Sequence, residues 1–182
     1  MVRGIAGALL LARGKPDGMD AFEPTMEDAR ASFLAALFCL PIFLLLRLGT
    51  GPAAVVPDPA RALVVDVIAF ACSWAGFALA SLPLAEAMGR RVLWPRFIAA
   101  WNWVNLVQYG VLAVLSLPEL FGLPRMMADT FALLGLGYAL WLQWFATRIG
   151  LGLSGPRAAV FVALDLGLSL FLSGLATRMA VG

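Results

Sequence analysis

The sequence has no histidine and few charged residues, and both absences narrow what the protein can do. Without histidine, the chain can form neither a histidine-ligated haem site nor a His-containing zinc site, and it has no histidine general base. Its two cysteines, Cys39 and Cys72, lie inside long apolar runs, so we expect small apolar side chains rather than a disulfide or a metal pair. The net charge of +2 gives no reason to expect a nucleic-acid partner.

Apolar residues dominate the composition. They make up 62% of the chain, charged residues make up 13%, and the mean hydropathy is +0.91. Soluble domains are typically about 45–50% apolar and about 25% charged, so this composition indicates an integral membrane protein. Lys15 is the single lysine among the basic residues and alanine is abundant, a bias typical of GC-rich bacterial genomes. We therefore expect the inner (cytoplasmic) membrane of a bacterium.

Five apolar segments are long enough to cross a bilayer, which takes about 20 residues. Clusters of proline and glycine separate them, as expected at helix ends. The sequence predicts an all-α, polytopic helical bundle in a transmembrane domain over residues 31–182. The five predicted spans cover residues 31–48, 60–84, 96–117, 127–149 and 157–176.

Residues 1–30 form a separate cytoplasmic or interfacial segment in this prediction. Their apolar run, "GIAGALLLARG", is too short to span and is not followed by a cleavage signature, which favours an amphipathic helix lying on the membrane. Arg3, Arg13 and Lys15 could then face anionic head groups. Thr25 followed by Asp28 predicts the N-cap of a helix that leads into the first span.

Basic residues in short loops predict the orientation, because they accumulate on the cytoplasmic side. With five spans, the N-terminal segment and the second and fourth loops share one side. That side has nine basic residues: Arg3, Arg13, Lys15, Arg30, Arg90, Arg91, Arg96, Arg148 and Arg157. The other side has four: Arg47, Arg61, Arg125 and Arg178. We therefore expect a cytoplasmic N-terminus and a periplasmic C-terminus.

The third predicted span, "RFIAAWNWVNLVQYGVLAV", contains a polar stripe. Asn102 and Asn105 are three residues apart and share a helix face, and Gln108 and Tyr109 continue it. A rise of 1.5 Å per residue places these asparagines roughly 7–14 Å from the cytoplasmic ends of the spans. Two residues of other spans fall in the same layer. The sequence thus predicts an intramembrane polar cluster of Asn102, Asn105, Gln143 and Asp165.

Two interpretations of this cluster remain open. It could be a site for a proton, an ion or a small ligand, or it could join helices by hydrogen bonds worth roughly 0.6 kcal/mol each, which we favour. A carboxylate is costly at this depth, so we expect Asp165 to be protonated or bonded to an amide. Asp66 lies nearer the outer interface, where we expect hydration or contact with Arg61 or Arg125. Asp66, Gln108 and Tyr109 are secondary polar candidates.

Three arginines beside Trp94, namely Arg90, Arg91 and Arg96, are candidates for binding a lipid phosphate, although ordinary anchoring of a cytoplasmic loop also explains them. We expect no cofactor and no metal, although a phospholipid could be bound. Small residues at helical spacing indicate close packing inside the bundle or against a partner. They are Cys72, Gly76 and Ala80 in the second span, and Gly167, Ser169, Ser173 and Gly174 in the fifth.

Enzymatic activity is not expected. Ser154 stands between glycines in "GLGLSGP" and is similar to the nucleophile of an intramembrane serine protease, but the chain has no histidine to take its proton. The segment also fits a turn before the fifth span.

The plan of a cytoplasmic N-terminal segment followed by five compact spans with short loops resembles the Yip1-type membrane proteins. The resemblance lies in topology and transfers no residue role; it implies an interaction or membrane-organising role rather than catalysis. The sequence therefore predicts a non-catalytic accessory, scaffold or assembly subunit of a bacterial inner-membrane complex. Its expected partners are membrane lipids and other subunits or further copies of itself. The alternative is a small transporter or channel that uses the polar cluster.

Overall fold

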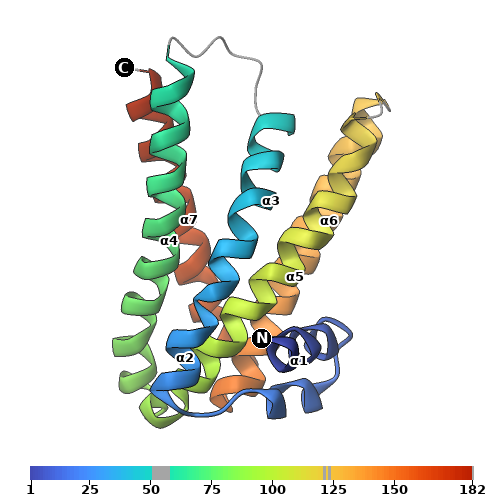
Figure 1. Ribbon diagram of the computed structural model, residues 1–182. Helices are drawn as coiled ribbons and strands as arrows, with labels where there is room; N and C mark the ends of the chain where they lie inside the picture. Colours follow the sequence, from blue (N-terminus) through green and yellow to red (C-terminus); the bar gives the residue numbers. More distant parts are fainter. Residues whose placement is uncertain (51–57, 121, 123, 182) are drawn as a thin grey trace.

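The computed structural model describes residues 1–50, 58–120, 122 and 124–181, and helix is the regular secondary structure of these ranges (Figure 1). The predicted all-α bundle is confirmed. Stretches long and apolar enough to cross a membrane occur four times in this part of the chain: Met26–Arg47, Pro59–Ala87, Arg91–Leu117 and Gly155–Met179. The elements in chain order are α1 (Val2–Ala12), η1 (Pro16–Ala21), α2 (Met26–Ser32), α3 (Leu34–Thr50), α4 (Pro59–Ala87), η2 (Arg91–Leu93), α5 (Trp94–Leu120), α6 (Arg125–Leu151) and α7 (Gly155–Val181).

The first predicted span differs in detail, because two helices replace the single one expected over residues 31–48. Phe33 separates α2 from α3. The predicted cap is confirmed: the Thr25 hydroxyl accepts a hydrogen bond of 3.2 Å from the backbone N–H of Asp28, which satisfies one of the free donors of the first turn of α2. The boundary predicted after residue 30 therefore falls inside α2.

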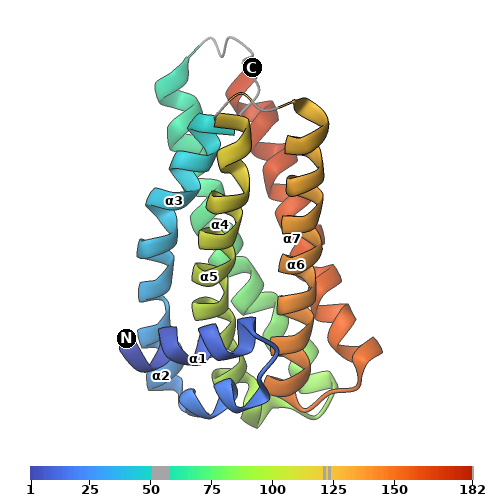
Figure 2. The same cartoon turned by 90° about the vertical axis from the view of Figure 1, so that its right-hand side faces the viewer.

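Helix α6 is as long as α5 and α7, at 27 residues each, but it is not among the four sufficiently apolar stretches. Two of its polar side chains are bonded to neighbouring helices. The Tyr138 hydroxyl donates to the carbonyl oxygen of Ala12 at 2.9 Å, and Gln143 donates to Asp165. Figure 2 shows α6 running beside α5 and α7. The described ranges thus contain five long helices, α3 to α7, and the least apolar of them, α6, is held by polar contacts.

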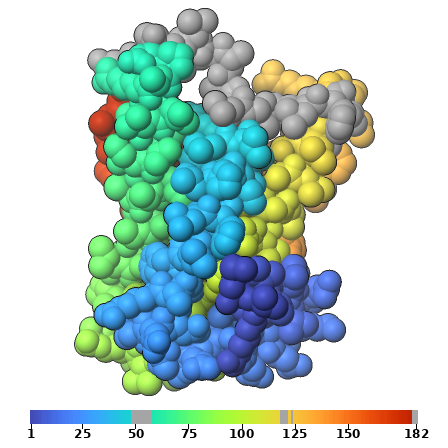
Figure 3. Space-filling model, in the orientation of Figure 1, coloured from blue at the N-terminus to red at the C-terminus, as the bar shows by residue number. Residues whose placement is uncertain are grey.

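The N-terminal helix α1 packs as part of the protein. It lies crosswise near one end of the bundle (Figure 2) and contacts α5 and η1. Figure 3 shows its dark blue atoms on the surface at this end. A Cβ atom at Gly4 would lie 2.6 Å from Nε1 of Trp103, so only glycine allows this close approach. Arg3 pairs with Glu23 at 2.9 Å, and Arg13 and Lys15 are exposed. Contact of these three residues with lipid head groups stays a prediction.

Aromatic side chains fill the half of the bundle nearest α1. Trp101 stacks on Phe77 with ring centroids 4.3 Å apart, and Trp74 meets Trp101 edge to face at 5.3 Å. Phe97 continues this aromatic column to Phe161 at 5.5 Å. All five side chains are buried, and such pairs add about 0.5–1.5 kcal/mol each to their area burial. This half of the bundle is therefore densely packed.

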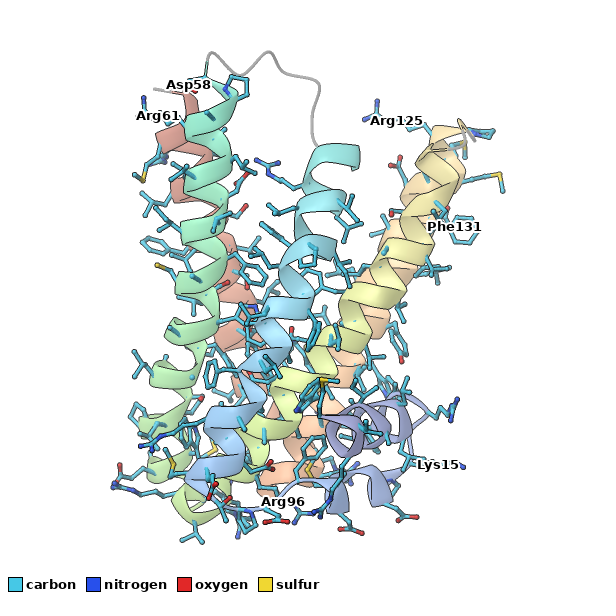
Figure 4. The ribbon with its side chains drawn as sticks, viewed as in Figure 1. Lys15, Asp58, Arg61, Arg96, Arg125 and Phe131 are labelled. Carbon is cyan, nitrogen blue, oxygen red and sulfur yellow. The ribbon has the colours of Figure 1, made fainter. Side chains whose placement is uncertain are left out.

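The two termini lie at opposite ends of the bundle (Figure 1). The N-terminal segment, the α4–α5 connection and the α6–α7 connection share one end, which we call the N-terminal end. Figure 4 shows Lys15 and Arg96 towards this end, and Arg61 and Arg125 at the opposite end. The bundle thus separates the two groups of basic residues that the sequence assigns to different sides.

Candidate functional site

Of the four residues predicted to form one polar cluster, two are bonded to each other. Nε2 of Gln143 donates to Oδ2 of Asp165 at 2.7 Å, which links α6 to α7. Thr147, one turn further along α6, donates its hydroxyl to the backbone oxygen of Gln143 at 2.7 Å. Gln143 and Asp165 therefore connect two helices.

Asn102 lies elsewhere than predicted. Its side chain is 0% exposed, and its Nδ2 donates to the Ser32 hydroxyl at 2.7 Å. Ser32 in turn donates to the backbone oxygen of Ala29 at 2.6 Å. Within the described part of the chain, Oδ1 of Asn102 has no hydrogen-bond partner. Asn102 thus holds α2 against α5 and is not hydrogen-bonded to Gln143 or Asp165.

Asn105, from the predicted cluster, and Gln108, a secondary candidate, both bond to backbone oxygen atoms. Asn105 donates to the carbonyl oxygen of Trp101, one turn earlier in α5, at 2.9 Å. Gln108 donates to the carbonyl oxygen of Ala139 in α6 at 2.8 Å. The polar stripe therefore fastens α5 to α2 and α6 at separate points.

Asp66 pairs with Arg47, whereas the sequence led us to expect hydration or contact with Arg61 or Arg125. Nε of Arg47 lies 3.0 Å from Oδ2 of Asp66, which joins α3 to α4. The Arg47 side chain is 38% exposed and that of Asp66 is 15% exposed. The prediction missed this pair because Arg47 was counted only as a basic residue at the end of a span, and sequence alone does not show which helices are neighbours.

The Arg47–Asp66 pair forms part of the wall of a cavity between α3, α4, α5 and α7. The cavity has a volume of about 260 Å³ and lies in the half of the bundle away from α1. Tyr109, a secondary candidate from the sequence, also lines it. The remaining lining residues are Phe43, Ala69, Phe70, Ser73, Ser169, Leu172, Ser173 and Ala176. An ion pair and several hydroxyl groups thus line one partly open space between these helices, which we call the polar cavity.

A larger cavity, of about 460 Å³, has the opposite character. It lies between α1 and α5, and its walls are apolar, from Ile5 and Leu9 to Val114 and Leu115. Such a surface suits lipid chains but offers no group for chemistry. We therefore place the candidate site in the smaller polar cavity. The described residues include no group of three or more acidic or cysteine side chains that could hold a metal ion.

The three arginines predicted to bind lipid phosphate each contact protein. Nη2 of Arg90 donates to the backbone oxygen of Gly152 at 3.2 Å, and Arg91 pairs with Glu86. Arg96 donates to the backbone oxygen of Met19 and to Asp20, both at 3.3 Å, and so ties η1 to α5. The arrangement supports a structural role, and lipid binding at these residues stays a prediction.

In comparisons with known proteins, no family model, curated protein or solved structure matches this chain. The topological resemblance to Yip1-type proteins therefore stays a prediction. What the chain itself shows is a helical bundle suited to cross a membrane several times, with a polar cavity in one half and an aromatic column in the other.

Proposed function

We propose that the protein is a non-catalytic, multi-pass protein of a bacterial inner membrane that binds a small polar solute in the polar cavity for passage across the membrane. The observation that carries this proposal is the ion pair of Arg47 and Asp66 in the cavity wall. Charged groups within a membrane domain are costly to keep and generally mark solute or ion paths. Three hydroxyl-bearing serines and Tyr109 line the same space, so a polar solute would meet hydrogen-bonding groups from four helices.

The dense N-terminal half supports a site that is open from one side. Trp101 packs against both Trp74 and Phe77 on the α1 side of the bundle. A transporter that alternates its access would keep one half closed while the other admits solute. In this proposal the aromatic column closes the α1 side of the bundle to the solute. The N-terminal end, with its nine basic residues, faces the cytoplasm, and the polar cavity belongs to the periplasmic half.

An accessory subunit is the second candidate, and the outward surface of α7 favours it. A Cβ atom added at Gly167 or Gly174 would meet no atom within 4 Å, and Leu170 and Phe171 between them are exposed. Two glycines seven residues apart allow another helix to approach closely. By contrast, a Cβ at Gly76 would meet Leu168 at 3.1 Å, so that part of the predicted small-residue face is used inside the bundle. A partner helix that dissociates in Gly167→Leu and Gly174→Leu variants would support this second candidate.

The first test asks whether the polar cavity contains water. Ser173→Cys, in a background with Cys72→Ala and Cys39→Ala, would be exposed to a small charged thiol reagent that does not cross membranes. We expect rapid modification in intact cells, because Ser173 lines the cavity. The matched control is Leu170→Cys on the same helix, where the side chain is 65% exposed and lines no described part of the cavity.

The control separates cavity water from general accessibility. If Ser173→Cys and Leu170→Cys were equally unreactive, the cavity would be dry and the proposed function would be wrong. If both reacted equally, α7 would be accessible to the reagent along its whole surface, and the result would contradict the proposal that the cavity is the path of the solute.

A further inference from the structure

Hydrogen-bond donors without partners accumulate in the polar cavity. Arg47 contacts Asp66 through Nε, and its two Nη groups have no partner among the described residues. In the same part of the chain, the hydroxyl groups of Tyr109 and Ser169 donate to no protein group. A guanidinium group carries five N–H donors and no acceptor. These donors are therefore free to bind a ligand that brings acceptor atoms, whereas the Asp66 carboxylate beside them is already bonded to Nε of Arg47.

We infer that the polar cavity binds a small organic carboxylate, held by the free edge of the Arg47 guanidinium group; this inference rests on the proposed function. A guanidinium group matches a carboxylate in planar, two-point hydrogen bonding. The two free Nη groups of Arg47 provide such an edge while Nε stays with Asp66. The Tyr109 hydroxyl can donate a further hydrogen bond to the bound anion.

The apolar part of the wall limits the rest of the ligand. Phe43 and Phe70 lie with ring centroids 5.0 Å apart, and Leu172 lines the cavity with them. These side chains can cover a short hydrocarbon tail, and a cavity of about 260 Å³ is suited to a small organic anion. A carboxylate with a tail of a few carbon atoms fits this combination. Inorganic phosphate has no apolar part to place against these rings.

The effect of replacing Asp66 on ligand affinity distinguishes an anion site from a cation site. Its carboxylate already neutralises Arg47, so it competes with an incoming anion for the guanidinium group and repels it. Replacing Asp66 by asparagine should therefore strengthen carboxylate binding, whereas replacing Arg47 should weaken it. A cavity built for a cation would show the reverse, because Asp66 would then be the ligand and Arg47 the competing charge.

The experiment measures binding of three radiolabelled probes to the full chain in nanodiscs by equilibrium dialysis: propionate, inorganic phosphate and tetramethylammonium. Arg47→Gln should weaken propionate binding by about tenfold to a hundredfold, since it removes a charged hydrogen-bond donor. Asp66→Asn should strengthen it severalfold. Arg61→Gln is the matched control, because Arg61 lies exposed near the same end of the bundle, lines no described part of the cavity and should leave binding unchanged.

Each other result of the binding experiment would overturn a defined part of the inference or of the proposed function. Tetramethylammonium binding that is lost in Asp66→Asn would replace the carboxylate by a cation and leave the proposed function standing. Binding of phosphate alone would replace the organic acid by an inorganic oxyanion. If no probe bound while Ser173→Cys remained reactive, the carboxylate inference would be wrong although the cavity is hydrated. If no probe bound and Ser173→Cys were also unreactive, the inference and the proposed function would both be wrong.

Discussion

Gln143 and Asp165 form a hydrogen bond of 2.7 Å between α6 and α7. We expect the two residues to be energetically coupled, so that the bond contributes to the stability of the protein. A double-mutant cycle with Gln143→Leu, Asp165→Leu and the double variant should give an interaction energy of about 0.6 kcal/mol, with about 1.7 kcal/mol as the upper end for such bonds in membranes. Unfolding in mixed detergent micelles measures it. Strictly additive single variants would show that the pair contributes nothing.

Ser32 should matter more to stability than its position near the start of the membrane domain suggests. Ser32→Ala leaves the amide of Asn102, which is fully buried, without its hydrogen-bond partner, and should cost about 1–3 kcal/mol. Asn102→Leu also removes this bond, but it takes away the unpaired Oδ1 as well and leaves the bond from Ser32 to Ala29 intact. We therefore expect Asn102→Leu to be the milder change. The same unfolding assay would contradict this account if the order were reversed.

The contact between α1 and α5 depends on the absence of a side chain at Gly4. Gly4→Ala would place a Cβ atom 2.6 Å from the indole of Trp103, which is itself buried, and should destabilise the docked helix by about 1–3 kcal/mol. Faster proteolysis near the N-terminus measures the loss of docking. Gly137→Ala in α6 is the matched control, because no atom lies within 4 Å of the added Cβ. Equal proteolysis of both variants would contradict the packing argument.

The proposed orientation predicts which cysteines a membrane-impermeant maleimide labels. In a background without Cys39 and Cys72, Arg61→Cys should be labelled in intact cells, and Lys15→Cys only after lysis. Both side chains are exposed and lie at opposite ends of the bundle (Figure 4). The opposite labelling pattern would invert the orientation and move the polar cavity to the cytoplasmic half.

The helices of this fold could be predicted from the sequence because apolar runs are bounded by proline and glycine. The predicted span 60–84 lies within Pro59–Ala87, and span 96–117 lies within Trp94–Leu120. The cap at Thr25 was also predictable, because it depends on neighbours in the chain. Local signals of this kind need no knowledge of which helices touch.

The partners across helices could not be predicted in the same way. Counting residues gives the depth of a side chain but not the direction in which its helix face points within the bundle. Asn102 and Gln143 were placed at similar depth, yet Asn102 faces Ser32 of α2 and Gln143 faces Asp165 of α7. Arg47 and Asp66 are near the same end of adjacent spans, but only the fold shows that they meet. The polar cavity follows from such pairings, and it was therefore missed.

The low apolarity of α6 has a consequence for how the chain enters the bilayer. In α6, Tyr138 is bonded to Ala12 and Gln143 to Asp165, so the helix is stable beside its neighbours. On its own, its low apolarity gives it little favourable free energy of insertion into lipid. Insertion of single segments is governed by their own hydrophobicity, with polar residues opposing it. During synthesis, α5 is already in place when α6 emerges, whereas α7 follows later. We therefore expect α6 to insert stably into the membrane only when the neighbouring helices are present. Assembly of this part of the bundle would then be cooperative and ordered.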